Sequence, residues 1–219
     1  ACFQGNCPTK SDVQTVCPSG FWGYRHAIGM PITIPDVPDP PVEIKLNGAP
    51  EMTMAVSTDP AFVGRAEHEA VLKGLLADLK FNYADERAET VDFMQKTQPH
   101  VFYFFCHGRL VQDTPSLEVG PPKSKGIFRE TLRLSDIFWE DVQPLVIING
   151  CHTAALLPER ALDLVSGFID TSNAAGVIGT EITNFVPVAR IFGEECLRRF
   201  FVEKQTIGEA VRGGRLAVL

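Results

Sequence analysis

The chain has 219 residues, of which 45% are hydrophobic and 21% charged, a composition typical of a globular protein with a sizeable core. Its formal net charge is -7 and it has no basic stripe, which argues against nucleic acid as a partner. No apolar run approaches the roughly 18 residues of a membrane span, and no secretory signal opens the chain. We therefore expect a cytoplasmic protein without a membrane partner. Because the chain begins with Ala1, we also expect a fragment of a longer protein.

Residues 1–50 predict an irregular segment and a proline-rich connector, and residues 51–219 predict the compact domain. Six prolines between residues 31 and 50 leave no room for a long regular element. The aromatic stretch 21–29 alternates loosely and predicts a strand.

Six cysteines divide between the start of the chain and its body: Cys2, Cys7 and Cys17, then Cys106, Cys151 and Cys196. The body cysteines fall on predicted strands and a helix, as in a reduced intracellular protein. The spacings of the first three match no common zinc pattern, so a loop disulfide and a partial metal site both stay open for them.

From residue 51 onward, strands and helices alternate, which is typical of a parallel sheet with right-handed crossovers. Short apolar runs predict strands at residues 52–57, 81–83, 99–106, 144–148 and 176–180. Apolar periodicity and capping residues predict helices at residues 63–79, 85–96, 136–142, 160–173, 186–202 and 206–216, with Asp85 and Ser135 as N-caps. His68 falls on the polar face of the first of these helices and is expected to be solvated. Residues 108–130 are polar and proline-rich and predict a long loop beside a substrate groove.

Two of the predicted strands end in residues suited to nucleophilic catalysis. One strand runs into His107-Gly108, and the strand at residues 144–148 is followed by Asn149-Gly150-Cys151. Ligands of open α/β sheets bind beyond the carboxyl ends of the strands, so parallel neighbours would bring His107 and Cys151 together. A thiolate is a strong nucleophile, and an adjacent imidazole can take its proton. Cys106 lies within its strand and is expected to be a buried structural cysteine.

These two stretches, Phe104-Phe105-Cys106-His107-Gly108 and Val146–Ala154, resemble the paired His-Gly and Cys boxes of CHAT domains. CHAT domains are caspase-like cysteine peptidases related to separase, gingipains and caspases. Residues 20–26, 175–181 and 192–194 also fit the family, so the resemblance covers roughly residues 20 to 218. It implies a caspase-like αβα sandwich with a mostly parallel central sheet.

The resemblance also implies a function, that of a thiol protease, a hydrolase that cleaves a protein substrate through a covalent acyl-enzyme. Cys151 would be the nucleophile and His107 the general base and acid, working as a dyad without a cofactor or metal. The backbone N–H groups of Gly108 and Cys151 would form the oxyanion hole. The sequence offers no acid that we assign to the histidine.

Specificity and regulation are implied less directly. In separase-like relatives an acidic residue holds a basic P1 side chain, and Glu181 and Asp170 are the candidates here, although each is as easily a solvated surface acid. CHAT domains often follow sensor regions, so we expect a regulatory domain or activator outside this chain. Two other interpretations stay open: an inactive caspase-like interaction module, and a metal site built from Cys106, His107, Cys151 and His152.

Overall fold

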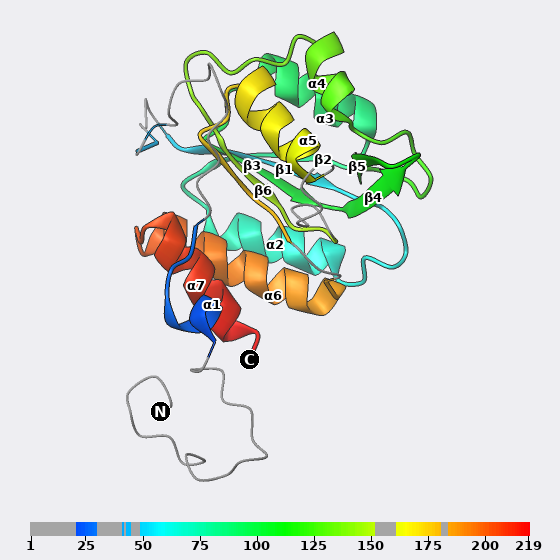
Figure 1. Cartoon of the computed structure of the whole chain (residues 1–219). Coiled ribbons are helices and arrows are strands. Elements are labelled where there is room, and N and C mark those ends of the chain that lie inside the picture. The colour runs from blue at the N-terminus through cyan, green and yellow to red at the C-terminus, as the bar shows by residue number, and fades with distance from the viewer. Residues whose placement is uncertain (1–20, 30–40, 42, 45–48, 152–160, 181–183) are drawn as a thin grey trace, which may run out of the picture. The chain divides into compact units, whose positions relative to one another are not determined.

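The computed structural model describes residues 21–29, 41, 43–44, 49–151, 161–180 and 184–219 (Figure 1). The chain divides into two compact units. The first, here called the sheet unit, contains residues 33–65 and 77–186. The second, the helical unit, contains residues 1–32, 66–76 and 187–219.

The sheet unit is built on a five-stranded sheet in which every neighbouring pair is parallel. Its strands lie in the order β2-β1-β3-β6-β7. They are β1 (Glu51–Val56), β2 (Lys80–Ala84), β3 (Val101–Phe105), β6 (Leu145–Ile148) and β7 (Gly176–Ile178). Every residue of β3 and β6 is buried, which explains why both read as continuous apolar runs rather than alternating ones.

Helices of the same unit flank this sheet and close its core. They are α3 (Arg87–Lys96), α4 (Arg129–Leu134) and α5 (Ala161–Ser166), which continues as the π-helical turn η3 (Gly167–Thr171). Figure 1 shows α3, α4 and α5 on the same side of the strands. Aromatic side chains that pack against one another, including Phe102, Phe104 and Trp139, belong to the buried core of this unit. The predicted α/β fold with a parallel central sheet is therefore confirmed.

The helical unit contains α1 (Trp22–Arg25), most of α2 (Arg65–Leu75), α6 (Val186–Leu197) with its π-helical extension η4 (Arg198–Val202), and α7 (Ile207–Ala217). Thr206 and Glu209 form a capping box that fixes the start of α7. Arg212 and Arg215 of α7 donate to the carbonyl oxygens of Tyr24 and Gly23, which ties α1 to this helix. Within the described part of the chain, no helix has the length and apolar character needed to cross a membrane.

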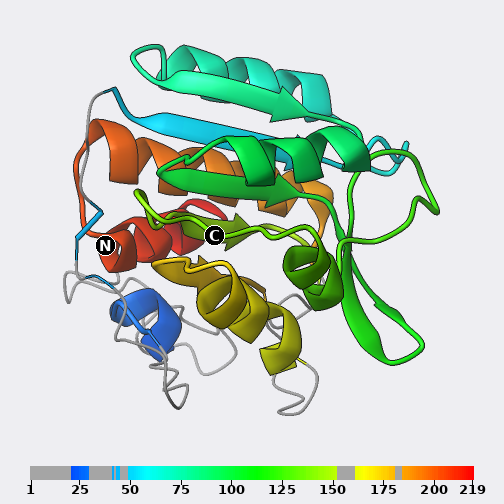
Figure 2. The same cartoon turned by 90° about the horizontal axis from the view of Figure 1, so that it is seen from above.

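The prediction of a long loop at residues 108–130 is wrong for the first half of this segment. Residues 107–118 form an antiparallel hairpin of β4 (His107–Val111) and β5 (Thr114–Glu118). The two-residue turn, Gln112-Asp113, has φ angles of 49° and 64°, the left-handed values that tight hairpin turns require. Figure 2 shows the parallel strands pointing to one side of the sheet, with the hairpin at that side. Polar composition hid the hairpin because only part of it is buried.

Three local predictions are also wrong. Residues 22–25 are helical and not part of a strand. The helix expected at residues 136–142 lies earlier, as α4, because the Thr131 hydroxyl accepts from the N–H of Phe128 and fixes the first turn there. Ser135 is consequently the C-cap of α4 and not an N-cap. The N-cap of α3 is Glu86 rather than Asp85.

His68 is fully buried within the helical unit, contrary to the expected solvated position. Its Nδ1 lies 2.9 Å from a carboxylate oxygen of Glu194 on α6. At His68, the polar face of α2 is therefore buried and not exposed to solvent. Burial is the largest influence on the imidazole and lowers the pKa of His68 despite the neighbouring carboxylate.

Candidate active site

Strand register brings the two predicted catalytic residues to one edge of the sheet. β3 and β6 are adjacent and parallel, with Phe104 paired to Ile148. His107 follows Phe104 by three residues, and Cys151 follows Ile148 by three. The N–H of Asn149 still donates to the Phe104 carbonyl oxygen at 2.8 Å, so the two chains stay side by side as the strands end. The prediction that these strand ends are neighbours is confirmed.

Gly150 permits an unusually close approach between the two strand ends. A Cβ atom on this residue would lie 2.3 Å from the carbonyl oxygen of Cys106 and 3.3 Å from the backbone nitrogen of Gly108. The first distance is shorter than any real side chain tolerates, so a glycine is required here. The main chain that immediately precedes Cys151 therefore packs against the main chain on both sides of His107.

The Cys151 thiol lies half-buried against the segment that follows β7. The Asn184 N–H donates to Sγ at 3.4 Å, and Sγ lies 3.4 Å from the Asn184 carbonyl oxygen. The Asn184 side chain reaches the amide oxygen of Asn149 at 3.5 Å, and the Thr180 hydroxyl donates to the carbonyl oxygen of Gly150. These contacts fix the turn on which the thiol is presented.

Two further thiols in the described part of the chain differ from Cys151 in their burial. Cys106 and Cys196 are both buried and free. Burial raises the pKa of the Cys106 thiol far above its ordinary value and raises the pKa of Cys196 to about 12. Both thiols stay protonated at neutral pH and are structural, as expected for Cys106.

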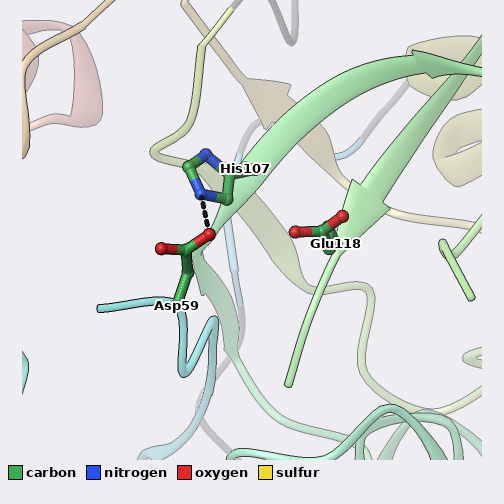
Figure 3. A group of neighbouring side chains, drawn as sticks. All are labelled: Asp59, His107 and Glu118. Carbon is green, nitrogen blue, oxygen red and sulfur yellow. Dashed lines mark hydrogen bonds and ion pairs between the residues drawn. The ribbon is translucent and has the colours of Figure 1, made fainter. Parts of the chain in front are cut away.

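A carboxylate that the sequence analysis did not identify pairs with the predicted base. His107 opens β4, and its Nε2 lies 3.2 Å from Oδ2 of Asp59, in the turn after β1 (Figure 3). The Ala61 N–H donates to Oδ1 of Asp59 at 2.8 Å and, ahead of the contribution of His107, lowers the pKa of that carboxyl group. The ring of Phe62 meets the imidazole edge-on, with centroids 4.8 Å apart. The turn after β1 thus contacts the imidazole through two residues, Asp59 and Phe62.

This pairing defines which imidazole nitrogen is free to accept a proton. An ionised Asp59 favours the tautomer with hydrogen on Nε2, which leaves Nδ1 as the acceptor. In Figure 3 the second ring nitrogen lies on the side of the ring away from Asp59. In the sequence, the signal for Asp59 was its position just after β1. This signal could be interpreted only with the sheet order, because Asp59 reaches His107 only if β1 lies beside β3.

Glu118 is the second acid close to His107. The two residues are register partners in the β4–β5 hairpin, and the Glu118 side chain is buried. Its Oε2 pairs with Nε of Arg109 at 3.0 Å. One ligand atom from each of Asp59, His107 and Glu118 lies within 4.8 Å of the others.

The remaining predicted site residues have other surroundings or lie outside the described residues. Asp170 lies in η3, where its Oδ2 pairs with Nη2 of Arg129 at 2.6 Å. Glu181 and His152 lie outside the described residues. Cys106 is buried in the core, and the group of possible metal ligands found among the described residues, Asp59, His107 and Glu118, does not include it.

The chain is similar to a curated protein that is named as a protease. Over 227 aligned residues, the chain is 41% identical to a protein of Vitiosangium sp. (strain GDMCC 1.1324) that is named "Probable protease". The alignment covers 100% of this chain and 30% of that protein, so the chain spans about a third of the relative's length. No protein-family model matches the chain.

Proposed function

We propose that this chain is the catalytic domain of a cysteine endopeptidase of the CHAT type, acting on a protein substrate. The observation that carries the proposal is the packing of Gly150 against the backbone of Cys106 and Gly108, which puts the two strand-end boxes in contact. The name of the relative, which is similar along the whole of this chain, supports a protease. The α/β fold with its parallel central sheet and the paired boxes support the cysteine type.

In the proposed reaction, Nδ1 of His107 takes the thiol proton of Cys151, and the thiolate attacks the carbonyl carbon of the scissile peptide. The resulting oxyanion accepts hydrogen bonds from the N–H groups of Gly108 and Cys151, whose backbones lie on the two adjoining strand ends. The imidazolium then protonates the leaving amine as the C–N bond breaks, and an acyl-enzyme remains on sulfur. Water, deprotonated by the same nitrogen, hydrolyses the thioester and restores the thiol.

Asp59 acts in this scheme as a positioning residue and not as a catalytic one. Its carboxylate contacts Nε2 and leaves Nδ1 as the proton acceptor. Because Oδ1 is held by the Ala61 N–H, Oδ2 cannot swing away from the imidazole without losing that hydrogen bond.

Substrate preference and regulation are part of the same proposal. A basic P1 residue would be recognised by Glu181 or by Asp170. Recognition by Asp170 requires that its carboxylate leave the ion pair with Arg129. The relative is about three times as long as the aligned region, which supports an effector domain governed by other parts of a longer protein.

Active-site labelling tests the proposal directly. The chain is incubated with a peptidyl acyloxymethyl ketone carrying Arg at P1, and with matched probes carrying Leu or Asp, and its intact mass is measured. We expect one adduct per chain at Cys151, lost in Cys151→Ala and reduced at least a hundredfold in rate in His107→Ala. Cys196→Ser is the matched control and should label like the wild type.

The set of probes separates the parts of the proposal. Labelling by the Leu or Asp probe alone would retain the peptidase and remove the basic preference. No labelling by any probe, in a chain shown to be folded by circular dichroism, would contradict the peptidase and favour the inactive interaction module.

A further inference from the structure

Glu118 presents a buried carboxylate oxygen that the rest of the described chain leaves unpartnered. Its Oε2 pairs with Arg109, but Oε1 has no hydrogen-bond partner among the described residues, and the residue is 5% exposed. An unsatisfied buried oxygen of an ionised group is costly, so such an atom normally has a hydrogen-bond donor or a cation beside it. The oxygen therefore points to a ligand.

The surroundings of this oxygen have the composition of a metal site. Asp59, His107 and Glu118 come from the turn after β1 and from the two strands of the hairpin, and their ligand atoms lie within 4.8 Å of one another. Figure 3 shows both carboxylate groups directed toward the space beside the imidazole. Two carboxylates and one imidazole are ligands that Zn²⁺ accepts, with the fourth position left to water.

We propose that Asp59, His107 and Glu118 form a binding site for a divalent transition-metal ion of the Zn²⁺ class, and that the bound ion prevents His107 from acting as a base. The second half of this inference rests on the proposed function, whereas the metal site itself does not.

The inhibitory effect follows from the two nitrogens of the imidazole. In the metal-free site, Asp59 favours hydrogen on Nε2 and an accepting Nδ1. A metal ion bound at Nε2 requires that nitrogen to give up its proton, and the neutral ring then carries hydrogen on Nδ1. The proton on Nε2 leaves to water and another arrives on Nδ1, so the ring's proton count is unchanged. Nδ1 is now a donor and cannot take the thiol proton of Cys151.

Arg109 is compatible with this site although it contributes a positive charge. Its guanidinium contacts Oε2 of Glu118, whereas the unpartnered oxygen is Oε1. A carboxylate can bind a metal through one oxygen while the other accepts from a donor, and such outer contacts orient metal ligands. The Arg109 side chain is 45% exposed and can also turn toward solvent.

Metal binding is tested first in Cys151→Ala, which removes the thiol as a competing ligand. ZnCl₂ is titrated into the protein by calorimetry, and CoCl₂ binding is followed by visible absorption. We expect one ion per chain, and at least a tenfold weaker affinity in Cys151→Ala combined with Glu118→Gln or with Asp59→Asn. Glu130→Gln removes an exposed, Arg133-paired carboxylate of α4 and is the matched control, expected to bind like the parent.

Either of two results would overturn the site: no stoichiometric binding to Cys151→Ala, or equal affinity in the parent and both carboxylate variants. The first would mean that any zinc binding of the wild type needs the thiol. Thermal melts of each variant show whether it is folded, and the isosteric Gln and Asn replacements keep the shape of the site.

The inhibitory half has a separate readout. In the wild type, ZnCl₂ at ten times its dissociation constant should slow probe labelling of Cys151 about tenfold, and EDTA should restore the rate. In Glu118→Gln the same ZnCl₂ concentration should slow labelling less than twofold. Unchanged labelling of a zinc-loaded wild type would refute the inhibition and leave the metal site intact. A chain that no probe labels would instead count against the proposed function.

Discussion

The carbonyl oxygen of Cys106 lies 2.3 Å from the position at which a side chain of Gly150 would begin. This contact joins the last residue before the base to the last residue before the nucleophile. The proposed reaction therefore depends on how closely the two strand ends approach each other. Replacement of Gly150 tests whether that spacing matters.

We expect Gly150→Ala to lower the free energy of unfolding by about 2 kcal/mol, because the methyl group must push the backbone of Cys106 away. The rate at which the probe labels Cys151, measured per folded molecule, should also fall. Gly74→Ala is the matched control: nothing lies within 4 Å of its Cβ position, and alanine suits the exposed end of α2. Urea denaturation and probe labelling of both variants make the comparison, and equal behaviour would contradict the close approach.

Asp59→Asn should reduce the labelling rate of Cys151 by roughly 10- to 1000-fold while the chain stays folded, since it removes the charge that fixes the imidazole tautomer. An amide that donates to Nε2 would favour hydrogen on Nδ1. The effect should appear in the rate of the chemical step and not in the affinity for the peptide probe. Asp92→Asn, an exposed acid of α3, is the control. A purely structural role for Asp59 would instead lower the melting temperature and leave the rate per folded molecule unchanged.

Cysteine alkylation should be selective within the described part of the chain. Iodoacetamide at pH 7.5 should modify Cys151 in the native protein at least a hundred times faster than Cys106 or Cys196, because burial shields both thiols and raises the pKa of each. Peptide mapping by mass spectrometry measures each site separately. Addition of urea should remove the difference, and its persistence in urea would argue against burial as the cause.

His68 should make the stability of the chain depend on pH. Burial lowers the pKa of its imidazole, with Glu194 and Arg190 as the charged neighbours, so the unfolded chain binds a proton more readily than the folded one. Stability is therefore fully present above the ordinary histidine pKa near 6.5 and is lost as pH falls below it. One such group contributes a slope of at most about 1.4 kcal/mol per pH unit.

Urea denaturation at pH 7.5 and pH 5 measures this dependence. His68→Gln should be less stable than the wild type at pH 7.5 but should lose less on acidification. His26→Gln, at an exposed position, should retain the wild-type dependence. A wild-type slope that persists in His68→Gln would assign the effect to other groups.

The sequence allowed prediction of the features that depend on local patterns. Buried strands are recognisable in the sequence as apolar runs. The prediction that the two strands preceding His107 and Cys151 are parallel neighbours is confirmed. Asp59 could not be predicted, since its role depends on which strand lies beside β3. His68 was misjudged for a related reason: a polar helix face becomes buried only when another element, here α6, packs on it.

The order of the strands also has a consequence for when the site can exist. β3 is completed at residue 105 and pairs with β1, but β6 is not complete until residue 148. A chain emerging from the ribosome can thus assemble the Asp59–His107 pair well before the nucleophile is made. The pairing of β3 with β6 (Val101 with Leu145) spans a sequence separation similar to that of β1 with β3 (Met52 with Val101), so the order of the two steps follows from the direction of synthesis. Synthesis would then deliver the base first and the thiol last, so that partly made chains carry no competent site.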